Sequence, residues 1–212
     1  WLGWLNVLRY IPFRTIMATI SAMLLTFLLA PWFIRELRRK QIGQVVREDG
    51  PVSHRHKAGT PTMGGALILL SLLLPTLLWA DLRNPFVLAT TAVTAGYGVI
   101  GYLDDYLKIK RKSSGGLPGR YKLLGQTLIG GAAIGYAFLL PNKLPADWFA
   151  IRNKMAFPFA AFSRFNIELH PVVYVMFAVF IVVGTSNAVN LTDGLDGLAI
   201  GPVMTSAATY LI

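Results

Sequence analysis

Long apolar runs that are almost free of charged residues constrain this chain more than any other feature of its sequence. Six such runs lie near residues 14–34, 62–80, 86–103, 123–140, 171–190 and 198–212. A helix needs about 20 mostly apolar residues to cross a bilayer, and its backbone groups must form their hydrogen bonds within the segment. The runs therefore predict an all-α, polytopic transmembrane bundle of about six helices in a single integral membrane domain.

Both ends of the sequence lead us to expect a longer polypeptide. The chain begins with Trp1 rather than Met, and its last apolar run stops at Ile212. That run is shorter than the roughly 20 residues of a spanning helix. We therefore expect the protein to continue beyond Ile212.

The composition narrows the classes of partner. Hydrophobic residues make up 54% of the chain and charged residues 14%, with a formal net charge of +10. This excess of positive charge suits anionic partners such as phosphates or acidic lipid headgroups. Nucleic acid is a poor partner, because the apolar runs leave little surface for a basic groove. The absence of cysteine excludes disulfides and thiolate chemistry.

Most of the basic residues fall in two connections, 35–60 and 104–122, which lie on the same side if the spans alternate. The positive-inside rule makes that side cytoplasmic. The N-terminus and the segment 141–170 are then outside. Prolines and aromatic residues in that segment predict an interfacial hairpin or a short amphipathic piece.

Two pairs of acidic residues border apolar runs on the predicted cytoplasmic side. Asp104 and Asp105 end the run near 86–103, and Asp193 and Asp196 precede the last run. Ion pathways place ionisable groups inside the bilayer, and after Arg14 the complete runs have none, which disfavours a transporter. The acids are either solvated boundary residues, with Asp193 as a helix cap, or a hard-cation site for Mg²⁺-assisted phosphoryl transfer.

A polar series with a three-residue period favours the second interpretation. Its members are Asn187, Asn190, Asp193 and Asp196. Neighbours in such a series share a helix face, but the full series drifts around the helix unless the helix breaks. Gly194 and Gly197 could supply that break. The alternative is a connection between two helices that is rich in Asn, Asp and Gly. It explains the composition of this stretch but not the three-residue spacing of its polar side chains.

The connection before the second run contains His54 and Lys57, followed by Pro61, Gly64 and Gly65. The proline and glycines stand at a predicted helix entrance, where backbone N–H groups can meet an anion. Alternatively, His54 and Lys57 only flank the membrane with their long side chains.

Three motifs resemble the polyprenyl-phosphate N-acetylhexosamine-1-phosphate transferase family. They are Ser53-His54-x-x-Lys57-x-Gly59-Thr60-Pro61-Thr62-Met63-Gly64-Gly65, Asp104-Asp105-Tyr106-x-Lys108, and Asn187-Ala-Val-Asn190-Leu-Thr-Asp193-Gly-Leu-Asp196-Gly-Leu-Ala199. The resemblance extends from about Arg14 to Ile212. It implies ten transmembrane helices in the complete family member, outward-facing termini, an active site on the cytoplasmic side of the bacterial inner membrane, and a homodimer.

The Thr60–Gly65 and Asn190–Asp193 stretches favour the muramoyl-pentapeptide branch of this family. The resemblance then implies transfer of phospho-MurNAc-pentapeptide from UDP-MurNAc-pentapeptide to undecaprenyl phosphate, with Mg²⁺, giving lipid I and UMP. The alternative within the family is transfer of GlcNAc-1-phosphate from UDP-GlcNAc to the same lipid. A transporter and a non-catalytic scaffold are the alternatives outside it.

The resemblance also assigns roles to residues of this chain. It implies catalytic roles for Lys57, Asp104 and Asp105, with Asp104, Asp105 and Asp193 as metal ligands. It implies a substrate-binding role for His54, Lys108, Asn187, Asn190, Asp193 and Asp196. A further aspartate motif and a histidine-rich loop of the family would lie beyond Ile212. The acceptor is a phosphate monoester, mostly dianionic at neutral pH, so a general base is not strictly needed. We expect direct in-line attack, and an aspartyl-phosphate intermediate is the alternative.

Overall fold

Helices account for most of the computed structural model, which describes residues 3–39, 63–111, 115–139, 146–156, 166–192 and 198–211. Apart from helices, these residues form one small two-stranded sheet. The prediction of an all-α membrane protein is confirmed. The chain divides into two compact units, residues 1–129 and 130–212, and the boundary falls within one helix.

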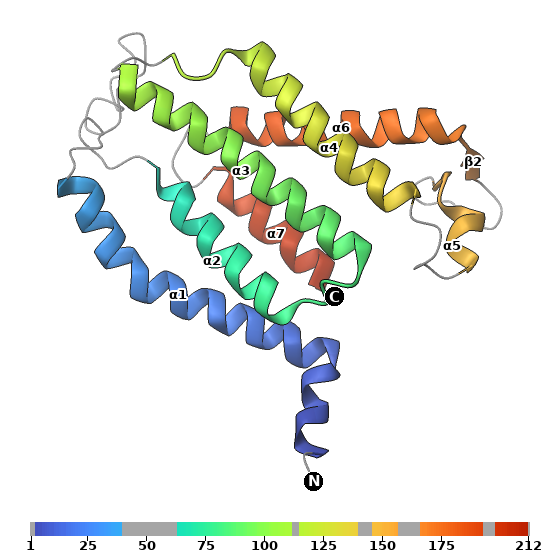
Figure 1. The fold of residues 1–212 in the computed structure, drawn as a ribbon, viewed down its shortest axis with the longest axis horizontal. Helices are drawn as coiled ribbons and strands as arrows, with labels where there is room; N and C mark the ends of the chain where they lie inside the picture. Colours follow the sequence, from blue (N-terminus) through green and yellow to red (C-terminus); the bar gives the residue numbers. More distant parts are fainter. Residues whose placement is uncertain are drawn as a thin grey trace. The chain divides into compact units, whose positions relative to one another are not determined.

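The first unit contains a short 3-10 helix and the helices that carry the candidate site. The elements are η1 (Gly3–Arg9), α1 (Ile11–Arg39), α2 (Gly64–Trp79), α3 (Pro85–Arg111) and the first half of α4 (Gly119–Leu139). Helix α1 packs along α2, and α2 packs along α3 (Figure 1). The α3 helix is therefore the central element that positions the site.

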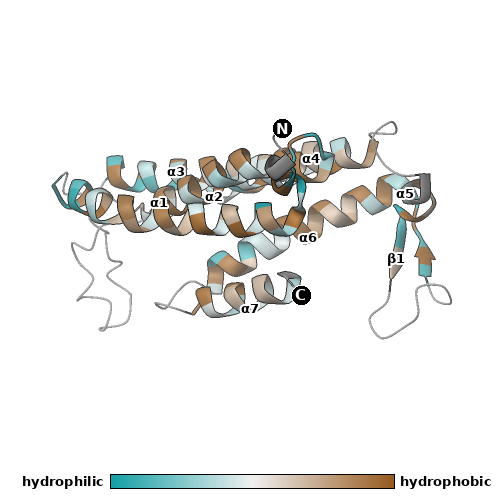
Figure 2. Cartoon of the chain, turned by 90° about the horizontal axis from the view of Figure 1, so that it is seen from below, coloured by the Kyte–Doolittle hydropathy of each residue, from teal (hydrophilic) through white to brown (hydrophobic). Residues whose placement is uncertain are grey.

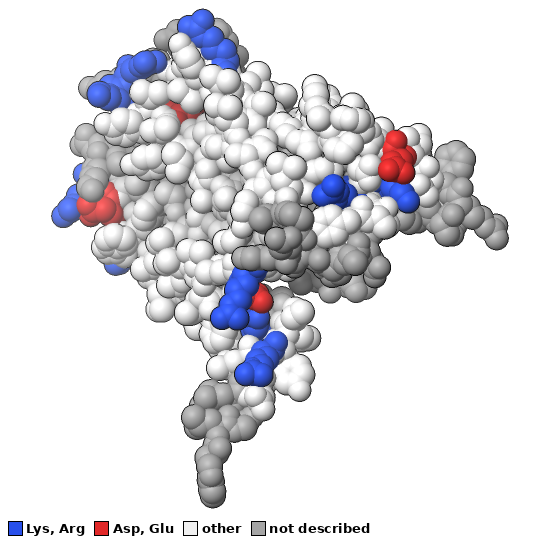
Figure 3. Space-filling view, turned by 45° about the vertical axis from the view of Figure 1, so that its right-hand side comes forward, with Lys and Arg blue, Asp and Glu red and all other residues white. Residues whose placement is uncertain are grey.

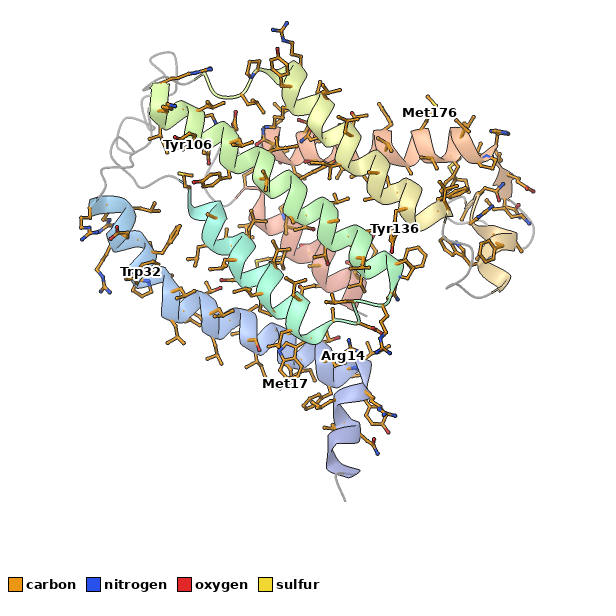
Figure 4. All side chains as sticks on the ribbon, in the orientation of Figure 1. Arg14, Met17, Trp32, Tyr106, Tyr136 and Met176 are labelled. Carbon is orange, nitrogen blue, oxygen red and sulfur yellow. The ribbon has the colours of Figure 1, made fainter. Side chains whose placement is uncertain are left out.

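A polar contact joins the start of α1 to the end of α2. The Nε of Arg14 donates a hydrogen bond to the carbonyl oxygen of Trp79, and the Trp79 indole donates to Ser21 Oγ at 3.0 Å (Figure 4). The Phe13 ring meets the Trp79 ring edge-on at 6.3 Å. The last carbonyls of a helix have no partner within that helix. Arg14 therefore gives one of them a partner at the end of the membrane segment.

Helix α3 approaches both of its neighbours closely because it carries glycine at the contacts. A Cβ atom at Gly98 would overlap the Leu69 side chain of α2, and one at Gly96 would overlap Ile129 of α4. The Tyr97 hydroxyl donates to the backbone oxygen of Gln126 at 3.0 Å. Small residues allow helices in membranes to pack this closely, so the path of α3 is set from two sides.

The second unit begins in α4 and contains a short hairpin. Its remaining elements are α5 (Ala146–Ile151), β1 (Lys154–Ala156), β2 (Asn166–Glu168), α6 (Pro171–Thr192) and α7 (Ile200–Leu211). The strands are antiparallel, with Lys154 opposite Glu168. The Arg152 guanidinium lies 4.7 Å from the Phe138 ring and donates to the Phe138 carbonyl oxygen at 3.1 Å. The described part of segment 141–170 thus contains a short helix and a pair of antiparallel strands, and the predicted position at the membrane interface stays a prediction.

Within the residues that the structure describes, three helices, α1, α3 and α6, are long and apolar enough to cross a membrane, which makes this a multi-pass membrane protein. Hydrophobic residues run along them (Figure 2), and Phe27, Leu28 and Phe180 are each more than 70% exposed. In the face drawn in Figure 3, charged atoms form separate groups with uncharged surface between them. Such exposed apolar area is compatible with lipid rather than with water.

Candidate active site

Asp104 and Asp105 lie inside α3 and do not end it. The hydropathy pattern placed them at the end of a run that stops at Leu103, but the helix continues for two further turns to Arg111. The prediction that they terminate the helix is wrong. Acidic residues are stabilised in a helix by basic residues three or four positions later, and basic residues suit its last turn. Lys108 supplies both effects here.

Lys108 bridges the two carboxylates. Its Nζ lies 2.6 Å from Oδ2 of Asp104 and 3.2 Å from Oδ1 of Asp105. The Asp104 side chain is only 16% exposed, whereas those of Asp105 and Lys108 are 36% and 38% exposed. Asp104 is therefore not a solvated boundary residue. Of the two acids, Asp105 offers more of its carboxylate to a ligand.

The connection between α3 and α4 closes on Asp104 from the other side. The backbone N–H of Leu117 donates to Oδ1 of Asp104 at 2.7 Å. Both oxygens of this carboxylate thus have partners from the chain itself, one on α3 and one in the connection. Hydrogen bonds that involve ionised groups are the stronger kind, so the Asp104 side chain is firmly oriented.

Aromatic and basic side chains surround this end of α3. The rings of Tyr102 and Tyr106 stack at 6.3 Å, and the Lys110 ammonium lies 6.0 Å from the Tyr106 ring (Figure 4). At the start of α4, the Arg120 guanidinium lies 4.9 Å from the Tyr121 ring. Tyrosine and basic residues are typical of the depth at which lipid headgroups meet water. The carboxylate pair therefore belongs to a segment with the composition of a membrane interface.

The residues present fit a magnesium ion, although no group of three acidic or histidine side chains forms within the described ranges. Mg²⁺ binds hard oxygen ligands and typically takes one or two carboxylates together with substrate phosphates and water. Asp105 is partly exposed, and Lys108 Nζ contacts one of its oxygens. Asp105 thus offers one partly exposed carboxylate to such a site, next to Asp104, whose two oxygens already have partners in the chain.

Of the polar series, the structure describes Asn187 and Asn190, both in the last two turns of α6. Asn187 is half-buried, and its Nδ2 donates to the carbonyl oxygen of Val183 at 2.8 Å. Asn190 is exposed. Both belong to the unit 130–212, whereas Asp104, Asp105 and Lys108 come together in the unit 1–129.

The remaining candidates lie outside the described residues. They are His54, Lys57, Asp193 and Asp196, together with the proposed break at Gly194 and Gly197. Before α2, the described residues begin with Met63, which has the left-handed backbone angles φ 71° and ψ 19°. The side chain of Met63, the N-cap residue, makes no capping hydrogen bond to the first turn of α2.

Two residues of the site were not found from the sequence. Gly116 and Leu117 stand in a Gly/Pro-rich stretch that signals a loop and nothing more. The hydrogen bond from Leu117 to Asp104 joins a backbone group to a side chain across 13 positions. No periodic pattern encodes such a contact, because it depends on the path of the loop.

Comparison with known proteins gives two family matches. Residues 87–212, more than half of the chain, match the model described as glycosyl transferase family 4. Residues 57–69 match the phospho-N-acetylmuramoyl-pentapeptide-transferase signature 1. The first match contains the carboxylate pair, and the second begins at Lys57.

Curated relatives are similar over nearly the whole chain. The phospho-N-acetylmuramoyl-pentapeptide-transferase of Sorangium cellulosum (strain So ce56) is 80% identical over 212 residues, which is 100% of this chain and 56% of the relative. The enzyme of Citrifermentans bemidjiense is 48% identical, and the match covers 98% of this chain and 55% of the relative. The enzyme of Anaeromyxobacter sp. (strain K) is 49% identical, and the match covers 99% of this chain and 57% of the relative. The chain thus spans little more than half the length of these relatives.

Proposed function

Because this chain belongs to glycosyl transferase family 4, we propose that it acts in a phospho-N-acetylmuramoyl-pentapeptide transferase. The observation that carries the proposal is the pair of carboxylates on α3 that share Lys108, within the region matched by the family model. In phosphoryl-transfer sites, carboxylates bind the divalent cation and a lysine contacts the phosphates. The match at residues 57–69 favours the muramoyl-pentapeptide substrate.

The proposed reaction exchanges one pyrophosphate bond for another. A phosphate oxygen of undecaprenyl phosphate attacks the sugar-linked phosphorus of UDP-MurNAc-pentapeptide and forms the new P–O–P bond. The bond from that phosphorus to the bridging oxygen breaks, and UMP leaves with the electron pair. The products are lipid I and UMP. The nucleophile is already anionic near neutral pH, so the step needs no general base. The attack is direct and in line, without a covalent aspartyl intermediate.

The chain's own residues bind and orient the reacting groups. Asp105 presents the more exposed carboxylate, and Asp104 is held by two partners. Lys108 neutralises part of their joint negative charge, which allows anionic phosphates to approach. Mg²⁺, when bound by Asp104, Asp105 and Asp193, would offset charge that develops on the phosphate oxygens.

The other assignments remain part of the same proposal. Lys57 contacts the donor near its phosphates, and His54 binds substrate. Asn187, Asn190 and Asp196 shape the nucleotide and metal region. The site faces the cytoplasm, the N-terminus is outside, and the whole protein is a homodimer in the bacterial inner membrane. The basic connections and the interfacial composition of the 102–121 region support this orientation.

A comparison of two donors tests the substrate. We expect the full-length protein, reconstituted with undecaprenyl phosphate and Mg²⁺, to release UMP from UDP-MurNAc-pentapeptide at least about 100-fold faster than from UDP-GlcNAc, because a site that binds the lactyl-peptide loses those contacts with the smaller sugar. UMP release is the measurement. Faster release from UDP-GlcNAc would assign the chain to the sister transferases, and no release from either donor would contradict a transferase.

A further inference from the structure

The α3–α4 connection holds one catalytic candidate in a fixed orientation. The Asp104 carboxylate accepts from the Leu117 N–H through Oδ1 at 2.7 Å and faces Lys108 Nζ through Oδ2 at 2.6 Å. These partners come from two different elements and bind opposite oxygens. Rotation of the carboxylate would break at least one of the two interactions. Its orientation therefore depends on how closely the connection approaches α3.

Gly116 is the residue that permits this approach. A Cβ atom built on Gly116 would overlap Oδ1 and Cγ of Asp104, and it would lie 2.9 Å from the Asp104 backbone oxygen. Rotating the Asp104 side chain cannot relieve the contact with a backbone atom of a helix. Any side chain at position 116 must therefore push the connection away from α3.

The requirement at this position is for space and not for an unusual backbone. The φ angle of Gly116 lies outside the left-handed region that favours glycine, so the argument for glycine here rests on the overlap with Asp104. At Gly119, the start of α4, a Cβ atom would meet nothing within 4 Å. Gly116 and Gly119 thus differ in whether the surrounding atoms leave space for a Cβ atom.

We propose that Gly116 is a positioning residue of this site, whose missing side chain lets the Leu117 N–H reach Asp104 and fix its carboxylate. The proposal rests on the proposed transferase function, since it assigns Gly116 a part in that reaction. Gly116 touches neither substrate and acts only through Asp104. Orientation of reacting groups governs the chemical step strongly, and small misplacements are costly.

The matched variants are Gly116→Ala and Gly119→Ala in the full-length protein. We expect Gly116→Ala to lower kcat by about ten- to hundredfold, with KM for both substrates within about twofold of wild type. Gly119→Ala should keep the wild-type kcat. Both variants should still unfold cooperatively in the same detergent, with a lower midpoint for Gly116→Ala because it loses the hydrogen bond from Leu117 to Asp104. Equal kcat values for the two variants, or an effect on KM alone, would overturn the proposal.

Hydrogen exchange tests the contact without relying on turnover. We expect the backbone of residues 115–117 to exchange faster in Asp104→Ala than in wild type, because the acceptor of the Leu117 N–H is gone, and to exchange as in wild type in Asp105→Ala. Unchanged exchange in Asp104→Ala would overturn the proposal even if Gly116→Ala failed to fold. A wild-type protein without turnover but with this exchange pattern would refute the transferase function and leave the contact established.

Discussion

Replacing Asp105 by Asn is expected to lower kcat by about 10²–10³-fold, the range seen when one preorganised electrostatic group of an active site is removed. The substitution preserves the size of the side chain and deletes only its charge. Asp105 is the more exposed of the two carboxylates and is contacted by Lys108 at 3.2 Å. The loss should therefore come from the missing carboxylate ligand of the cation that in turn binds the phosphates. Steady-state UMP release by the full-length protein measures it.

Asp81→Asn is the matched control for this variant. Asp81 is exposed in the turn between α2 and α3, where its carboxylate accepts from the backbone N–H of Arg83. The Asp81→Asn variant loses the same negative charge, but near the opposite end of α3. We expect its kcat to stay at the wild-type level. A kcat for Asp105→Asn within about twofold of wild type would remove Asp105 from the reaction.

Replacing Lys108 by Met is expected to lower kcat by about ten- to hundredfold. Lys108 is the one cation that contacts both carboxylates among the described residues. Without it, two adjacent negative charges repel each other and the incoming phosphates. Methionine keeps the apolar length of the side chain, so the packing of α3 should be preserved. The measurement is kcat at saturating concentrations of both substrates.

Lys110→Met provides the matched control, since it removes the same charge from the same end of α3. Lys110 is exposed and lies 6.0 Å from the Tyr106 ring. We expect a kcat close to that of wild type. If both lysine variants lost activity equally, the effect would reflect the general basicity of this segment and would contradict a specific role for Lys108.

The fold class was predictable because lipid imposes a simple rule on the chain. Apolar runs of sufficient length must be helical, and α1, α3 and α6 follow that rule. The end of α3 was not predictable by the same reasoning. The apolar run ends at the first charged residue, whereas the helix ends where its backbone hydrogen bonds end. The contacts of Lys108 with Asp104 and Asp105 stabilise the helical turns that follow the apolar run.

The site was predictable in its residue types and only partly in its arrangement. The motif Asp104-Asp105-Tyr106-x-Lys108 named two acids and a lysine, but the apolar run stopped before them and did not place all three on one helix. The resemblance implied only a substrate-binding role for Lys108, whereas the structure places its ammonium between the two carboxylates. The contact of Leu117 with Asp104 depends on the path of the connection, which local sequence signals do not specify.

A single-turnover experiment tests most directly whether this site transfers a phospho-sugar between two phosphates. The donor is UDP-MurNAc-pentapeptide labelled at its sugar-linked phosphate, and the full-length protein is supplied with Mg²⁺ with or without undecaprenyl phosphate. Our account predicts that UMP and labelled lipid appear in equal amounts only when the acceptor is present, and that no label stays on the protein. Label bound to Asp104 or Asp105 with donor alone, or no UMP with both substrates, would contradict it.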